Sequence, residues 1–203
     1  MSDLRVQTSG DLSVKFTNDV HGIAFETNPI RIEAAPQSRH YWGDLHGQSE
    51  ETIGTNSAEA YFKFARDLAF VDVSGHQGND FQITTDFWMH LDELCKKFNQ
   101  DGKFIAIPGY EWSGNTGLGG DRNIYFPSEG RTLRRSSHAL VSDHSDISTD
   151  CNSAAELFSA FAENDESDVV VYAHCGGRYA DIELAHDGRF EKSMEIHSSW
   201  GTF

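Results

Sequence analysis

Positive charge is scarce in this sequence of 203 residues. Lys and Arg together number 16 against 32 Asp and Glu, which gives a formal net charge of −16 at pH 7. A protein that neutralises nucleic-acid phosphates or docks on anionic lipids needs the opposite excess, so we expect neither nucleic-acid binding nor membrane binding. Proline is also rare, with 4 residues, and 38% of the residues are hydrophobic. This composition predicts a folded core rather than disorder.

Cysteine is rare as well, and long apolar runs are missing. Cys95, Cys151 and Cys175 are far apart, odd in number and without a CxxC pair, so no disulfide framework is predicted and a reducing compartment is favoured. No stretch approaches the roughly 18 apolar residues that span a bilayer. The first five residues, Met1–Arg5, lack the apolar core of a secretory signal. We therefore expect a cytoplasmic globular protein.

The first 37 residues have the pattern of short strands. Apolar and polar residues alternate in Leu12–Phe16, Gly22–Glu26 and Ile30–Ile32, with turn residues between them. No catalytic group stands out there. We expect a β-rich leading segment over residues 1–37 and a main domain over residues 38–203.

After Pro36, strand patterns alternate with helix patterns. We expect helices over about Ser57–Leu68 with Asn56 as N-cap, through Phe87–Phe98, and from a capping box formed by Ser153 and Glu156. The expected strands are Tyr41–His46, Phe70–Ser74, Phe104–Pro108, Ile124–Phe126, Val169–Ala173 and Met194–His197. This alternation predicts an α/β fold with a parallel sheet or barrel, in which the active site lies at the carboxyl ends of the strands.

Potential metal ligands stand at five of these strand ends. They are Asp44 and His46, His76, Glu111, His174, and Glu195 with His197. The period of two places Asp44 and His46 on one face of their strand. Imidazole and carboxylate are the ligands that zinc, manganese and iron accept in proteins. The pattern therefore predicts a site for divalent Zn, Mn or Fe.

Four segments resemble one known family in their order and spacing: Trp42–Gln48, Gly75–Asp80, Pro108–Trp112 and Tyr172–Arg178. The family is the PHP (polymerase and histidinol phosphatase) superfamily of metal-dependent phosphoesterases, and the chain looks closest to a bacterial branch of unknown function. The resemblance covers about residues 40–200. It implies a distorted, TIM-like β/α barrel with two or three metal ions that activate a water to attack a phosphate ester.

The resemblance also implies roles for single residues. His46 resembles the first His of a His-x-His motif, His76 the His that ends the second strand, Glu111 a bridging carboxylate and His174 the His of a later Ala-His motif. The sequence departs from the family at Gln48 and Gly75, where a second His and an Asp are expected. The closing Asp-x-His motif is absent as well, so we expect a barrel that is incomplete at its C-terminus, in a truncated protein.

The remaining site candidates are assigned by their chemistry. Asp44 and Glu111 are our candidates for the catalytic carboxylates, and Asp44 is either a ligand or a group that orients His46. Arg122 and Arg178 are candidates for holding a substrate phosphate or carboxylate, and a surface or inter-loop ion pair is the alternative for each.

The expected function is that of a metal-dependent hydrolase acting on a small-molecule phosphate ester. Three alternatives remain, and the first is a metal site of the same kind that cleaves an amide or another ester. Gly43–Gly47 also resembles the opening motif of calcineurin-type metallophosphatases, although the later motifs of that family match poorly or are missing. A PHP-like scaffold that binds one ion weakly, or none, is the non-catalytic alternative.

Overall fold

The chain divides into two units, Met1–His40 and Tyr41–Phe203. The structure, a computed structural model, describes residues 5–199 and 201–202. The division follows His40, whereas the boundary expected from the sequence followed residue 37. Among the described residues, no helix is both long and apolar enough to cross a bilayer.

The first unit contains two antiparallel pairs of short strands. β2 pairs with β3 and β1 pairs with β4. Their bounds are β1 (Gly10–Leu12), β2 (Lys15–Asn18), β3 (Ile23–Glu26) and β4 (Ile30–Ile32). The rings of Phe16 and Phe25 stack across the β2–β3 pair with their centroids 4.8 Å apart, a cross-strand contact that stabilises such pairs. The single strand expected over Leu12–Phe16 is divided between β1 and β2.

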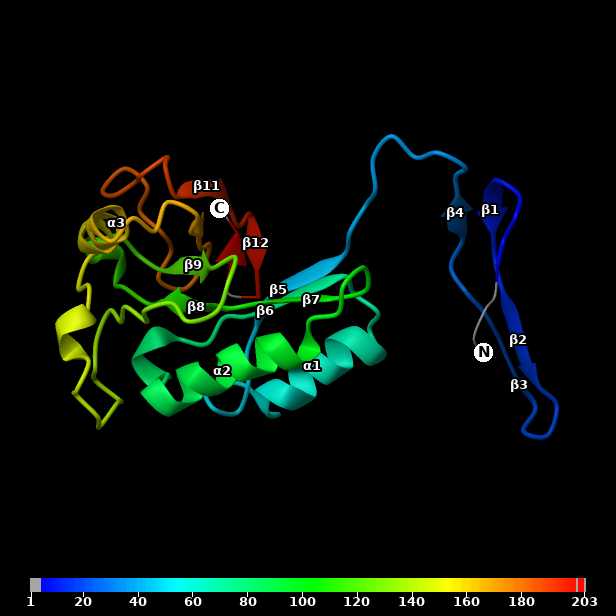
Figure 1. Ribbon diagram of the computed structural model, residues 1–203, viewed down its shortest axis with the longest axis horizontal. Coiled ribbons are helices and arrows are strands. Elements are labelled where there is room, and N and C mark those ends of the chain that lie inside the picture. Colours follow the sequence, from blue (N-terminus) through cyan, green and yellow to red (C-terminus); the bar gives the residue numbers. More distant parts are fainter. Residues whose placement is uncertain (1–4, 200, 203) are drawn as a thin grey trace. The chain divides into compact units, whose positions relative to one another are not determined.

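The second unit begins with a parallel three-stranded sheet. It has the order β5-β6-β7, with bounds β5 (Gly43–Gly47), β6 (Val73–His76) and β7 (Ile105–Ile107). The helices α1 (Ala58–Asp67) and α2 (Thr85–Phe98) connect these strands and lie along one face of the sheet (Figure 1). This part follows the strand–helix alternation of the sequence.

A second sheet, in the order β11-β10-β9-β8, departs from the expected barrel. Its strands are β8 (Gly109–Trp112), β9 (Arg122–Tyr125), β10 (Val170–Ala173) and β11 (Glu191–Met194). β9 runs antiparallel to both β8 and β10, and β10 and β11 alone are parallel. A β/α barrel needs parallel neighbours joined by crossover helices. The prediction of a TIM-like barrel is therefore wrong: the described residues form a mixed α/β fold with three α-helices, several small sheets and no closed barrel.

Short elements complete the second unit. They are the 3₁₀ turns η1 (Asp80–Gln82), η2 (Thr116–Leu118) and η3 (Ile147–Thr149) and the antiparallel pair β12 (His197–Ser198) and β13 (Gly201–Thr202). The last expected strand, Met194–His197, is not continuous. β11 ends at Met194 and β12 begins at His197, so Glu195 lies in the connection between them.

Each α-helix begins at a hydroxyl cap. Ser57 Oγ accepts from Ala60 N at 3.2 Å at the start of α1, so Ser57 is the N-cap in place of the expected Asn56. Thr84 Oγ1 accepts from Phe87 N at 3.1 Å at the start of α2. The last helix, α3 (Ala154–Glu163), begins as expected, with Ser153 Oγ accepting from Glu156 N at 3.2 Å. These bonds satisfy amide groups that have no partner within the helix.

We expect the free energy of unfolding of the Ser153→Ala variant to be about 1 kcal/mol lower than that of the wild-type protein, because the variant loses this cap. Urea denaturation followed by circular dichroism measures the difference. Ser159→Ala is the matched control, since Ser159 lies exposed in the same helix. Equal losses in the two variants would show that the cap contributes nothing.

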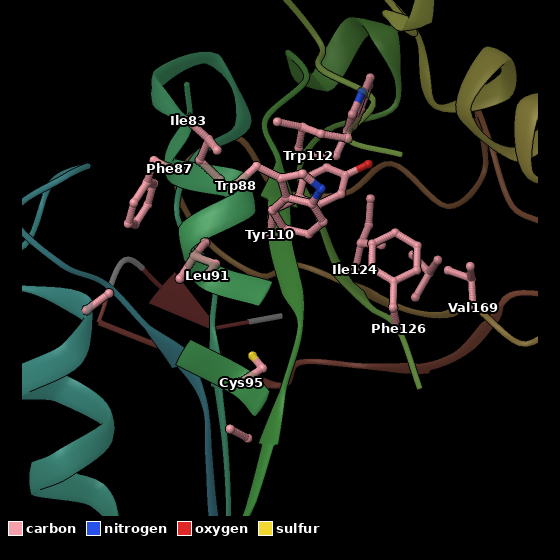
Figure 2. Close-up of a cluster of buried hydrophobic side chains, with 14 of the residues drawn as sticks. Ile83, Phe87, Trp88, Leu91, Cys95, Tyr110, Trp112, Ile124, Phe126 and Val169 are labelled. Carbon is pink, nitrogen blue, oxygen red and sulfur yellow. The ribbon is translucent and has the colours of Figure 1, made fainter. Parts of the chain in front are cut away.

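Part of the core of the second unit lies between α2 and the strands β8 and β9 (Figure 2), and α1 and α3 contribute further buried side chains. The indole ring of Trp88 meets the rings of Tyr110 and Phe126 edge-on, at centroid distances of 5.6 and 6.1 Å. The Trp88 indole N–H donates to the Arg131 carbonyl at 2.8 Å, and that of Trp112 donates to the Cys151 carbonyl at 2.9 Å. Buried aromatic rings with paired N–H groups hold β8 firmly, and β8 carries Glu111.

Candidate metal centre

A cavity of about 740 Å³ lies where several strands of the second unit end, and its volume is typical of small-molecule sites. His46 comes from the last part of β5 and Glu111 from β8, while His174 and Glu195 directly follow the parallel strands β10 and β11. The ionisable side chains that line the cavity are His46, Glu111, Asp121, His174, Arg178, Glu195 and His197.

His46 lies between two glutamates. Its Nδ1 is 2.7 Å from Glu195 Oε1, and its Nε2 is 3.2 Å from Glu111 Oε2. Burial alone would lower the pKa of His46, but the hydrogen bonds to Glu111 and Glu195 raise it to about 9. The imidazole therefore faces a carboxylate at each nitrogen.

His174 joins this group from the end of β10. Its Nε2 is 3.6 Å from Glu195 Oε2, and its ring stands edge-on to the His46 ring at a centroid distance of 5.0 Å. Burial lowers the pKa of His174, which favours the neutral imidazole that metals bind. One ligand atom from each of His46, His174 and Glu195 lies within 4.8 Å of the other two, a spacing that allows a shared ion.

Glu111 and Asp121 add carboxylates to the same cavity. Asn79 Nδ2 donates to Glu111 Oε1 and to Ser113 Oγ, each at 3.0 Å, and so fixes the plane of the Glu111 carboxylate. Burial and the nearby charge of Glu111 raise the pKa of Asp121. Three carboxylates around two imidazoles form a site that favours a cation.

Asp44 does not line the cavity. The pairing of β5 with β6 shifts in register between Asp44 and Gly47, so the simple alternation of side chains breaks down there. The Asp44 side chain is exposed, and its Oδ1 accepts from the backbone N–H of His46 at 3.1 Å. It supports the backbone at His46, and the structure does not bring it to the site.

His76 is buried beside the site but does not line the cavity. Gly78 N donates to its Nδ1 at 3.1 Å, so its Nε2 carries the proton and donates to Ser49 Oγ at 2.7 Å. Burial lowers the pKa of His76 to about 4. Because both ring nitrogens are used within the protein, His76 is a neutral histidine that holds the β5–α1 loop.

The two arginine candidates lie in different environments. Arg178 lines the cavity, where its Nε is 3.3 Å from Asp121 Oδ1 and its guanidinium lies 5.4 Å from the centroid of the Phe81 ring. Arg122 is fully buried and pairs with Glu191 at 2.6 Å. The structure therefore does not place Arg122 where a substrate could reach it.

Other polar side chains at or near the site include His197, Asn79 and Ser113. His197 is exposed in β12 and lines the cavity. Reasoning from strand ends did not assign Asn79 or Ser113 a role. Ser113 directly follows β8 and Asn79 lies three residues after the end of β6, so a position just beyond a strand end was the signal that could have identified them.

Residues 24–178 match the model of the family described as "Protein of unknown function (DUF3604)". The chain belongs to this family. An uncharacterized protein of Chlamydia pneumoniae is 26% identical over 181 residues, which make up 88% of this chain and 27% of that protein. An uncharacterized protein of Chlamydia muridarum is 20% identical over 99% of this chain and 31% of its own length.

These comparisons correct the resemblance drawn from the motifs. The family that matches is one of unknown function, and the relatives are uncharacterized, so the assignment to the PHP superfamily is wrong. The chain spans less than a third of the length of these two relatives.

Proposed function

We propose that this DUF3604 chain binds a divalent metal ion through His46, His174 and Glu195, with Glu111 as a further ligand, and that it is a metal-dependent hydrolase. The observation that carries the proposal is the spacing of the first three residues, whose ligand atoms lie within 4.8 Å of one another. Protein–metal bonds of about 2 Å fit such a triangle after small side-chain adjustments.

The donor set fits zinc, manganese or iron. Two imidazoles and two carboxylates combine neutral and charged ligands, which balances a divalent charge without crowding carboxylates together. A bound ion of this kind polarises an ester and lowers the pKa of a coordinated water. Glu195 contacts both histidines and sets their orientation, and Asn79 does the same for Glu111.

A phosphate ester is the substrate class that we propose. Among the described residues that line the cavity, Arg178 is the one that carries a permanent positive charge, and its guanidinium can hold two phosphate oxygens at once. The pair with Asp121 orients Arg178 beside the proposed ligands. Positive charge next to the ion also offsets the net charge of −16, which otherwise repels an anionic substrate.

The competing proposal is a scaffold without catalysis. It is favoured by the pKa of about 9 for His46, because a protonated His46 between Glu111 and Glu195 would satisfy both carboxylates without a metal ion. In that case the site would be a set of ion pairs that stabilises the ends of β5, β8 and β11.

Metal content and hydrolysis distinguish the two proposals. We expect protein purified without chelator, then supplied with Zn²⁺, Mn²⁺ or Fe²⁺ and desalted, to retain about one ion per chain in elemental analysis. We also expect it to hydrolyse at least one chromogenic phosphate ester and to lose that activity after dialysis against EDTA. Retention of no ion and no hydrolysis with any of the three metals would support the scaffold.

A further inference from the structure

A second cavity, of about 290 Å³, adjoins the cavity of the metal centre. The two share Phe81 and Arg178 as lining residues. We call the smaller one the side cavity. Its other walls come from the loop before η2, from Leu118 at the end of η2, and from the polar segment after β9, which includes Ser136, Ser137 and Leu140.

The side cavity differs sharply in charge from the metal centre. The larger cavity is lined by the carboxylates of Glu111, Asp121 and Glu195, whereas no acidic side chain is among the described residues that line the side cavity. Because the chain has 32 acidic residues, a cavity whose described lining has no acidic side chain is unexpected from the composition. Arg178, at the shared wall, is the charged group nearest to a ligand in the side cavity, so a neutral or anionic group is accepted there.

The lining combines apolar and hydroxyl or amide groups. Leu118 and Leu140 are 47% and 67% exposed, so their apolar surfaces are available for contact. Ser137 Oγ accepts from Ala139 N at 3.1 Å, which leaves its O–H as a donor. Asn115 stands at the N-cap of η2, but its side chain makes no capping bond. This is a surface on which the C–H faces and hydroxyl groups of a polyol both find partners.

A buried carboxylate holds two walls of the side cavity together. Asp80 is fully buried, and its oxygens accept from Ser113 N at 2.8 Å and from Ser136 N. Ser136 Oγ also donates to the Ser113 carbonyl at 3.1 Å. Because these bonds join groups of the protein itself, they fix the two walls relative to each other, which lowers the entropic cost of binding.

We propose that the side cavity binds the alcohol part of the substrate, and that this alcohol is a hydroxylated ring of about the size of a monosaccharide. The inference rests on the proposed hydrolase function. With the phosphate beside Arg178, the ester oxygen points toward the shared wall at Phe81. In the hydrolysis the P–O bond to the alcohol breaks, water adds a hydroxyl group to phosphorus, and the other proton of the water goes to the departing alcohol.

The test compares glucose 1-phosphate, which has such a ring, with methyl phosphate, which does not. The variant Leu140→Trp fills the side cavity, and Leu184→Trp is its matched control, because Leu184 is 57% exposed and lines neither cavity. We expect Leu140→Trp to lower kcat/KM for glucose 1-phosphate roughly tenfold and to leave that for methyl phosphate unchanged. Leu184→Trp should change neither value.

Failure of this inference and failure of the hydrolase proposal give different results. If metal-loaded protein hydrolyses both esters and Leu140→Trp lowers both rates equally, or neither, the side cavity is not the alcohol site although the hydrolase proposal stands. If neither ester is hydrolysed, calorimetric binding of the same two probes decides. Tighter binding of glucose 1-phosphate that is lost in Leu140→Trp supports the side cavity as a ligand site, and equal binding of the two probes overturns it.

Discussion

The Glu195→Gln variant is expected to bind Zn²⁺ or Mn²⁺ about 100-fold more weakly than the wild-type protein. Glu195 is the group that contacts both histidines of the proposed site, His46 at 2.7 Å and His174 at 3.6 Å. Loss of a group that only supports a ligand costs about 10- to 100-fold in metal affinity, so loss of a ligand charge belongs at the upper end of that range. Glutamine keeps the size of the side chain and removes its charge.

Isothermal titration calorimetry of metal-free protein measures this effect. Glu183→Gln is the matched control, because Glu183 is exposed and does not line the cavity. Circular dichroism spectra and thermal denaturation establish that both variants are folded. If the Glu195→Gln and Glu183→Gln variants bind metal as tightly as the wild-type protein, Glu195 is not a ligand and the proposed site is wrong.

Reasoning from strand ends found the residues that meet at the cavity because parallel neighbours end at one edge of a sheet. His174 and Glu195 follow the parallel pair β10 and β11, and His46 lies in the last part of β5. The same rule also predicted His76 as a ligand, because His76 ends the strand β6. Its two ring nitrogens bond to Gly78 and Ser49, and such local pairing leaves no trace in the sequence pattern.

The direction of β9 marks where the sequence could no longer predict the fold. Arg122–Tyr125 is buried throughout, and a fully buried strand has the same pattern in parallel and antiparallel sheets. The connection from β8 to β9 contains only the turn η2 and no α-helix. A short connection of this kind permits an antiparallel neighbour, and the barrel is lost at this point. The structure does not place Asp44 at the site for a related reason. The register shift in β5 arises from its pairing with β6, and the sequence pattern does not reveal it.

The Arg122→Ala variant is expected to lower the free energy of unfolding by about 3–5 kcal/mol, the usual cost of removing one partner of a buried ion pair. Neither side chain of the Arg122–Glu191 pair is more than 3% exposed, and Nε and Oε1 are 2.6 Å apart. Arg122 also donates to the carbonyls of Gly120 at 3.1 Å and Ala185 at 2.8 Å. Its removal leaves the Glu191 carboxylate buried and these carbonyl groups unpaired.

Urea denaturation of the wild-type and Arg122→Ala proteins measures this difference, and Arg189→Ala provides the control. Arg189 pairs with Asp187 at 2.6 Å, but its side chain is 66% exposed, so solvent already screens the pair and no measurable change is expected. If Arg122→Ala keeps the wild-type stability but loses hydrolysis, Arg122 acts on the substrate as the sequence suggested. A large loss of stability in Arg122→Ala alone identifies Arg122 as the residue that ties β9 to β11, because a group that only binds substrate leaves the unfolding of the free protein unchanged.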